Sequence, residues 1–229
     1  MKGSPMVPYL IPNTSPPIYQ FMDVFSRLYR DRILVAQGFI TEEYANNLIA
    51  ILLYLQKDDP KKPVTMYCNL SGGFPRPSLA LYDTMRSLQS SGIKIVTLNL
   101  GFCAGMGSFI VAAGDKGSRF AMPNSILRVS RPSAGGTIQG QAEDIGKEVA
   151  NVLRGNARIE KEMATMTGQT PEKLRKDLAR NFYLDSGEAV EYGFVDKILQ
   201  PQGKAKEDKG GKEEGGLGEF SSGQKYGEQ

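Results

Sequence analysis

The chain has 229 residues, of which 40% are hydrophobic and 23% are charged, as in an ordinary globular domain. Its formal net charge of +3 is too small to indicate a nucleic-acid or membrane-surface partner. The sequence contains no histidine, which excludes a Ser-His-Asp triad, a Cys-His dyad and a His-ligated zinc site within this chain. The two cysteines are too few for a disulfide scaffold, and a reducing compartment is expected.

The amino-terminal part of the chain is rich in proline. Residues 1–17 contain five prolines, which predict an extended or irregular arm rather than a packed element. Helical spacing of apolar residues predicts a short helix over Ile18 to Arg30. A strand is expected over Arg32 to Ala36, and a helix is expected from Thr41, an N-cap residue, to about Lys57.

Strands, glycine-rich turns and helices then alternate. Val64 to Leu70 is predicted as a strand that ends in a Ser71-Gly72-Gly73 turn, and a second strand over Ile93 to Leu100 ends in a turn over Gly101 to Gly107. Helices are predicted over Pro77 to Ser91 and from Ser108, and a third strand over Ser125 to Ser130. This alternation indicates an α/β fold with crossover connections.

The carboxyl-terminal part begins with a long helix. Apolar residues at helical spacing predict it from about Gln141 to Met166, and Gly168 ends it. A helix from Thr170 to about Ala179, a capped helix over Ala189 to Tyr192 and a strand over Val195 to Leu199 follow. Residues 201–229 consist mainly of Gly, Lys and Glu and are predicted to be a disordered tail.

The two glycine turns have two interpretations. Backbone N–H groups at Gly72, Gly73 and Met106 are able to surround one carbonyl oxygen, which would form an oxyanion hole. Alternatively, the glycines serve only the turns, because glycine adopts backbone conformations that other residues avoid.

Several motifs together resemble the ClpP family of self-compartmentalised serine peptidases. They are Asn69-Leu70-Ser71-Gly72-Gly73, Leu81-Tyr82-Asp83-Thr84-Met85, the run from Ala112 to Ser125, the run from Gly140 to Ile145, and the run from Glu188 to Asp196. The resemblance covers residues 18–200. It implies a ClpP/crotonase-type α/β fold of repeated strand-strand-helix units, with a protruding handle helix at about 131–166, between the arm at 1–17 and the tail at 201–229.

The resemblance also assigns the positions of the peptidase triad. Ala104-Gly105-Met106-Gly107 matches the nucleophile turn and places Gly105 at the serine position. Val129-Ser130-Arg131-Pro132 matches the segment that carries the base and places Ser130 at the histidine position. Asn181 is the best match to the orienting aspartate. Because all three residues differ from the triad, the chain resembles the catalytically inactive ClpR proteins of plastids and cyanobacteria.

The resemblance implies an architectural function. ClpR subunits share heptameric rings with active ClpP subunits, and two rings form a barrel on which a hexameric AAA+ unfoldase docks. This places the chain in the chloroplast stroma, with the cyanobacterial cytoplasm as the alternative. No cofactor, nucleic acid or membrane insertion is expected for this chain.

Two alternatives retain an enzyme activity. A crotonase-like enzyme would use the glycine turns to stabilise an acyl-CoA oxyanion, but no Glu or Asp is paired with Gly105 and Met106 in the sequence. A peptidase with a relocated nucleophile would use Ser71, Ser108 or Ser130 with Lys116, or use Cys103. We expect Lys116 on the surface and Cys103 in the core.

Two arginines flank the expected base position. Arg128 and Arg131 are either ordinary charges at a strand edge or cations that fill the cleft by pairing with a carboxylate.

Overall fold

The computed structural model describes residues 5–10, 19–132 and 139–200. The tail predicted at 201–229 and most of the arm predicted at 1–17 lie outside these residues. No helix within the described residues combines the length and apolar character needed to cross a membrane.

The first described element is a hairpin. β1 (Met6–Leu10) pairs with β2 (Tyr19–Asp23) in antiparallel register, and α1 (Val24–Arg30) follows directly. The helix expected from Ile18 therefore begins only at Val24, because the residues before it pair with β1. The Asp23 carboxylate accepts a hydrogen bond from the Ser26 backbone N–H at 3.1 Å and caps the helix.

The main sheet has five parallel strands in the order β10-β7-β5-β4-β3. These strands are β3 (Ile33–Ile40), β4 (Val64–Gly73), β5 (Ile95–Asn99), β7 (Arg119–Ala121) and β10 (Lys197–Ile198). Parallel neighbours need crossover connections, so the α/β architecture predicted from the sequence is confirmed.

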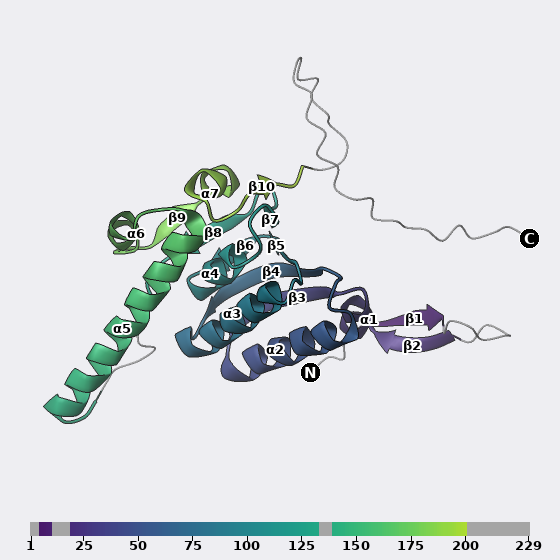
Figure 1. Cartoon of the computed structure of the whole chain (residues 1–229), viewed down its shortest axis with the longest axis horizontal. Helices are drawn as coiled ribbons and strands as arrows, with labels where there is room; N and C mark the ends of the chain where they lie inside the picture. Colours follow the sequence, from purple (N-terminus) through teal and green to yellow (C-terminus); the bar gives the residue numbers. More distant parts are fainter. Residues whose placement is uncertain (1–4, 11–18, 133–138, 201–229) are drawn as a thin grey trace, which may run out of the picture.

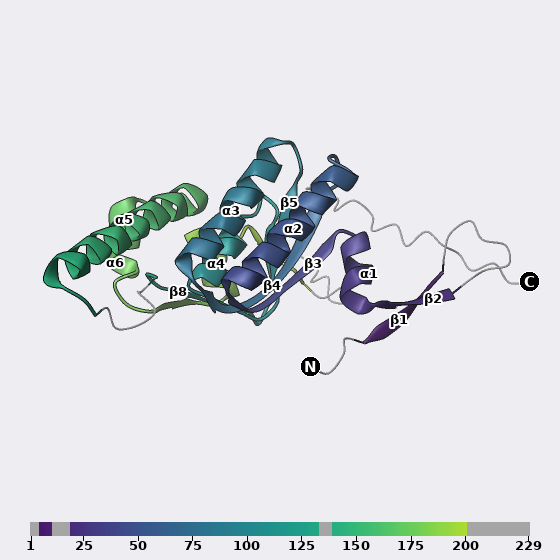
Figure 2. The same ribbon diagram turned by 90° about the horizontal axis from the view of Figure 1, so that it is seen from below.

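Helices connect the strands and cover the sheet. They are α2 (Glu42–Asp58), α3 (Pro75–Ser90), α4 (Met106–Ala112) and α7 (Ser186–Tyr192). α2 and α3 lie side by side over one face of β3, β4 and β5 (Figures 1 and 2). Their apolar residues, such as Leu52 and Met85, are fully buried in the core.

A second sheet of three short strands holds the candidate site. β6 (Phe102–Ala104) pairs in parallel with β8 (Ile126–Val129), and β8 pairs in antiparallel register with β9 (Phe182–Leu184). β6 lies within the segment expected as a glycine turn, and neither β7 nor β9 was predicted. Such short strands carry little periodicity, so their neighbours in the fold define them.

The turn predicted at Ser71-Gly72-Gly73 is wrong. β4 continues to Gly73, and Gly72 and Gly73 pair with Phe39 and Ile40 of β3 after a register shift. A Cβ at Gly73 would lie 2.8 Å from the Ile40 Cβ and 2.7 Å from the Ser78 Oγ. Glycine at position 73 therefore allows β4 to approach its neighbours closely, as well as permitting the end of the strand.

The long helix α5 (Ala142–Thr167) confirms the helix expected at 141–166, and Gly168 ends it with φ +74°. Its buried residues are Ile159, Glu160 and Met163, all in its carboxyl-terminal half. The other half projects from the body, at the opposite end from the β1-β2 hairpin (Figures 1 and 2). α6 (Pro171–Asp177) follows and packs against α5.

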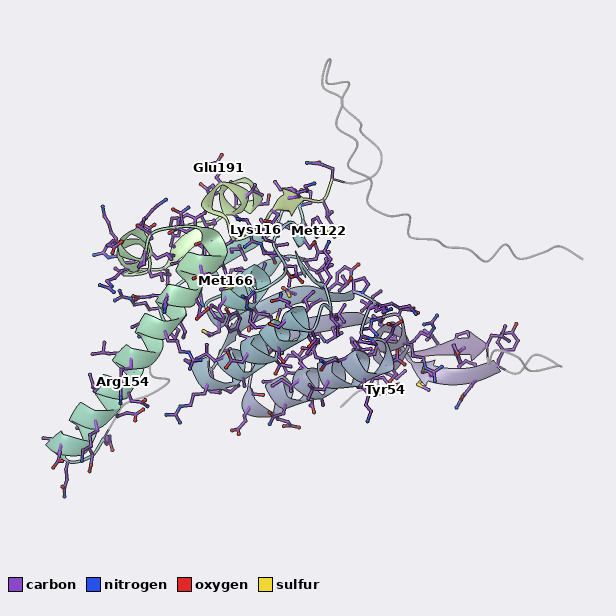
Figure 3. All side chains as sticks on the ribbon, in the orientation of Figure 1. Tyr54, Lys116, Met122, Arg154, Met166 and Glu191 are labelled. Atoms are coloured by element: carbon purple, nitrogen blue, oxygen red, sulfur yellow. The ribbon has the colours of Figure 1, made fainter. Side chains whose placement is uncertain are left out.

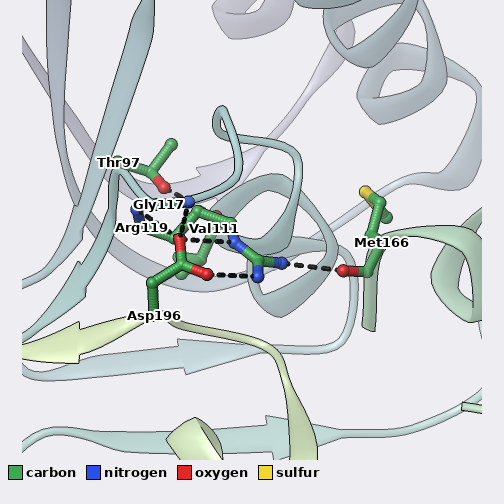
Figure 4. Close-up of polar contacts among 6 residues, drawn as sticks. All are labelled: Thr97, Val111, Gly117, Arg119, Met166 and Asp196. Carbon is green, nitrogen blue, oxygen red and sulfur yellow. Dashed lines mark hydrogen bonds and ion pairs between the residues drawn. The ribbon is translucent and has the colours of Figure 1, made fainter. Parts of the chain in front are cut away.

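An ion pair fixes the last strand to the body (Figure 4). Arg119 is 3% exposed, and its guanidinium donates to both carboxylate oxygens of Asp196, with Nη2 to Oδ1 at 2.7 Å and Nε to Oδ2 at 3.0 Å. Its Nη1 donates to the Met166 carbonyl oxygen at 2.9 Å. This network joins β7, the end of α5 and the segment before β10, so the chain returns to the sheet at a fixed position.

Candidate functional site

Gly105 lies at a sharp bend between β6 and α4. Its backbone has φ +52° and ψ −114°, a conformation that L-amino acids rarely adopt. Its N–H donates to the Arg128 carbonyl oxygen of β8 at 2.8 Å, and its carbonyl oxygen accepts from the Phe109 N–H of α4. The bend is thus anchored to both the sheet and the buried helix.

Ser130 lies next to this bend. A Cβ built on Gly105 would be 3.6 Å from the Ser130 Oγ, and Ser130, half-buried, directly follows β8. The structure therefore brings together the positions that resemblance assigned to the nucleophile and the base. Gly105 has only a hydrogen atom in place of a side chain, and Ser130 carries a hydroxymethyl group.

Asn181 directly precedes β9 and is exposed. Val129 pairs with Phe182 in the antiparallel β8-β9 register, so Ser130 and Asn181 are the next residues along the two strands. The register brings Asn181 to the same end of the second sheet as Ser130. All three assigned triad positions therefore lie at the same end of the second sheet.

The residues expected to form an oxyanion hole lie on β4 and α4. Gly72 and Gly73 end β4, and Met106 begins α4 and is buried. A Cβ at Gly107 would lie 2.6 Å from the Leu70 Cβ, so the start of α4 packs directly against β4. This close approach explains the glycine at 107 by packing, and the oxyanion-hole function of the other three residues stays a prediction.

Ser108 is fully buried, and its hydroxyl is hydrogen-bonded to the backbone. Its Oγ lies 2.9 Å from the Cys103 carbonyl oxygen and 3.0 Å from the Arg128 carbonyl oxygen. Its one hydroxyl proton is therefore directed at backbone acceptors. Ser108 stabilises the bend instead of presenting a free nucleophile.

Cys103 is also buried, as expected. Burial raises the pKa of its thiol to about 12. At neutral pH the group is an unreactive thiol, because the thiolate is the nucleophilic form. Lys116 is exposed, as expected, and it forms no ion pair or hydrogen bond through its side chain with the described residues.

Arg131 pairs with a carboxylate. Its Nε donates to Glu160 Oε1 of α5 at 2.8 Å, and Arg175 Nε of α6 lies 3.3 Å from Glu160 Oε2. The structure thus favours the pairing interpretation for Arg131. Arg128 instead places its guanidinium 5.9 Å from the centroid of the Phe102 ring.

Glu160 and Arg175 were not identified from the sequence. A signal was nevertheless present, because Glu160 lies between Ile159 and Met163 on the apolar side of a long helix. A charged residue at such a position needs a partner when it is buried.

Comparisons with known proteins agree with this arrangement. The family model "Clp protease" matches residues 18–202. The chain is 40% identical over 197 residues to "ATP-dependent Clp protease proteolytic subunit 2" of Prochlorococcus marinus (strain NATL2A), covering 86% of this chain and 96% of the relative. It is 37% identical over 203 residues to "ATP-dependent Clp protease proteolytic subunit 3" of Synechococcus sp. (strain CC9605), covering 89% of this chain and 98% of the relative.

The chain therefore belongs to the Clp protease family. The family resemblance drawn from the sequence motifs is confirmed.

Proposed function

We propose that this chain is a non-catalytic, ClpR-type subunit of an ATP-dependent Clp peptidase core. The observation that carries the proposal is Gly105, which occupies the bend at the nucleophile position beside Ser130 and has no side chain. Acyl transfer by a serine peptidase needs a nucleophile and a base that accepts its proton near pH 7. A hydroxyl at position 130 cannot supply that base, and the chain contains no histidine.

The nearby nucleophilic groups also support this proposal. The Ser108 hydroxyl is buried against backbone carbonyl oxygens, and burial raises the pKa of the Cys103 thiol. The Cys103 group is therefore a thiol and not a thiolate at neutral pH, and the Ser108 hydroxyl is fully buried. The bend at Gly105 is therefore present, but it carries no side chain that acts as the serine of a peptidase does.

The proposed role is to build the barrel. We place the chain in mixed heptameric rings with active ClpP and other ClpR subunits, in a two-ring barrel on which an AAA+ unfoldase docks. The projecting half of α5 supports this role, since Val149 and Leu153 are exposed there and Leu153 is 63% exposed. Exposed apolar side chains on a projecting helix are typical of a surface that contacts another subunit. The proposed location is the chloroplast stroma, with the cyanobacterial cytoplasm as the alternative.

Fluorophosphonate labelling tests the proposal. The native complex is isolated through a tag on this subunit, treated with the reagent, and every chain is measured by intact mass. We expect this chain to remain unlabelled while a co-purifying homologue gains the adduct. An adduct on this chain, for example at Ser108 or Ser130, contradicts the absence of catalysis, and isolation of this chain without homologues contradicts the assembly.

A further inference from the structure

The second sheet has an exposed face that is mainly apolar. The side chains on this face, which we call the β6-β8-β9 patch, belong to Phe102 of β6, Ile126 and Arg128 of β8, and Tyr183 of β9. Phe102 pairs with Ile126, and Arg128 pairs with Tyr183, and paired residues point to the same side of a sheet. On β8 these residues alternate with buried ones, so the opposite face lies in the core.

This composition is not that of an ordinary solvated face. A sheet that covers a core on one side usually carries polar residues on the other. Here Phe102 is 36%, Ile126 43% and Tyr183 56% exposed. Large apolar side chains that lie next to one another on a surface indicate a contact with another protein, and aromatic residues and arginine are enriched in the central part of such contacts.

The patch is separate from the exposed apolar residues of α5. Figures 1 and 3 share one orientation, and Arg154, labelled in Figure 3, lies on the projecting part of α5, away from β8 and β9. The chain therefore has two exposed apolar surfaces, and the contact assigned to α5 leaves the patch uncovered.

Arg128 gives the patch an unpaired positive charge. Its side chain is half-buried, and its Nε is buried with no hydrogen-bond partner among the described residues. Its guanidinium also forms no ion pair with a carboxylate of these residues and lies 5.9 Å from the centroid of the Phe102 ring. Because guanidinium groups bind carboxylates through parallel N–H donors, the patch fits a partner that presents a carboxylate within an apolar surface.

We infer that the β6-β8-β9 patch packs against a neighbouring subunit of the Clp barrel and that Arg128 binds a carboxylate of that subunit. The inference rests on the proposed function, because the barrel supplies the partner. A symmetric contact of the patch with itself offers no carboxylate, since none of its four residues is acidic. The patch therefore meets a different surface of its neighbour, as in the head-to-tail contacts that form a ring.

Photo-crosslinking of the intact complex tests the location of the contact. Tyr183→p-benzoyl-phenylalanine is made in the tagged full-length chain, where it replaces one exposed aromatic residue by another. The native complex is irradiated, purified and digested for mass spectrometry. We expect a crosslink to a co-purifying Clp-family subunit, close to an Asp or Glu. A crosslink only to residues 201–229 of this chain or only to an unfoldase, or no crosslink in a complex that contains homologues, overturns the inference.

Charge reversal tests the role of Arg128. Arg128→Glu should reduce the homologous subunits recovered with the tagged chain by at least about tenfold, because it leaves the partner's carboxylate next to a second negative charge. Arg180→Glu is the matched control and should leave recovery unchanged, since Arg180 is exposed and lies outside the patch. Changing the crosslinked Asp or Glu of the partner to Arg should restore recovery with Arg128→Glu, which a folding defect would not allow.

The outcomes separate this inference from the proposed function. A wild-type chain that purifies without homologues contradicts the barrel assembly and the inference with it. Equal recovery of homologues with the wild type and Arg128→Glu, or a reversed partner carboxylate that fails to restore recovery, overturns only the contact at the patch.

Discussion

Replacing Gly105 with alanine tests the backbone geometry at the nucleophile position. The residue has φ +52° and ψ −114°, and an added Cβ would lie at an ordinary van der Waals distance, 3.6 Å, from the Ser130 Oγ. Steric overlap is therefore absent and only backbone strain remains. A residue held in such a conformation costs about 1 to 3 kcal/mol. We expect Gly105→Ala to lower the free energy of unfolding by this amount.

Urea unfolding of the full-length chain measures the effect. The midpoint should fall without a change in slope, because the surface exposed on unfolding is unchanged. Gly155→Ala is the matched control, since Gly155 lies within α5 and its added Cβ meets nothing within 4 Å. Alanine in a helix is favoured over glycine by about 1 kcal/mol, so this variant should be more stable than the wild type.

The two variants together separate strain from other effects. If Gly105→Ala unfolds at the wild-type urea concentration, the backbone at this bend does not have a positive φ and the reasoning is refuted. A loss far above about 3 kcal/mol would instead mean that the space beside Ser130 is filled.

The ion pair at the last strand predicts a dependence of stability on pH. Partial burial raises the pKa of Asp196, but hydrogen bonds and the charge of Arg119 outweigh this effect and lower it overall. The stabilisation by this ion pair is therefore present above the unfolded pKa of about 3.9 and is lost as pH falls through the lower folded pKa. In urea unfolding, Asp196→Asn should have a lower free energy of unfolding than the wild type at pH 7. Its free energy of unfolding should then fall less than that of the wild type on acidification. Separately, Gly105→Ser with Ser130→His and Asn181→Asp should gain fluorophosphonate labelling, whereas Gly105→Ser alone should not, because nothing accepts its proton. A folded triple variant that stays unlabelled would contradict the placement of the three positions at one end of the second sheet.

The long elements were predicted because their sequences carry the signal locally. α2 begins after the Thr41 cap, and α5 ends at Gly168, as apolar spacing and capping residues indicated. The short strands were missed for the opposite reason. β7 and β9 have three residues each and exist because neighbouring strands supply their hydrogen bonds.

The two glycine-rich segments show the same difference between a local sequence signal and contacts with neighbouring strands. The sequence predicted turns at both glycine-rich segments, but Gly72 and Gly73 continue β4, and only the segment at Gly105 contains a sharp bend. A glycine residue permits a turn and also permits close strand packing. The neighbours Phe39 and Ile40 decide which of these occurs.

The sequence by itself determined what chemistry the chain lacks. No fold adds an imidazole to a chain without histidine, and no conformation gives Gly105 a nucleophile. Only the tertiary structure decided that Gly105, Ser130 and Asn181 lie at the same end of the second sheet, and that Glu160 is buried between Arg131 and Arg175. The physical reason is that composition is fixed residue by residue, whereas burial and proximity depend on strand pairing and helix packing between segments far apart in the chain.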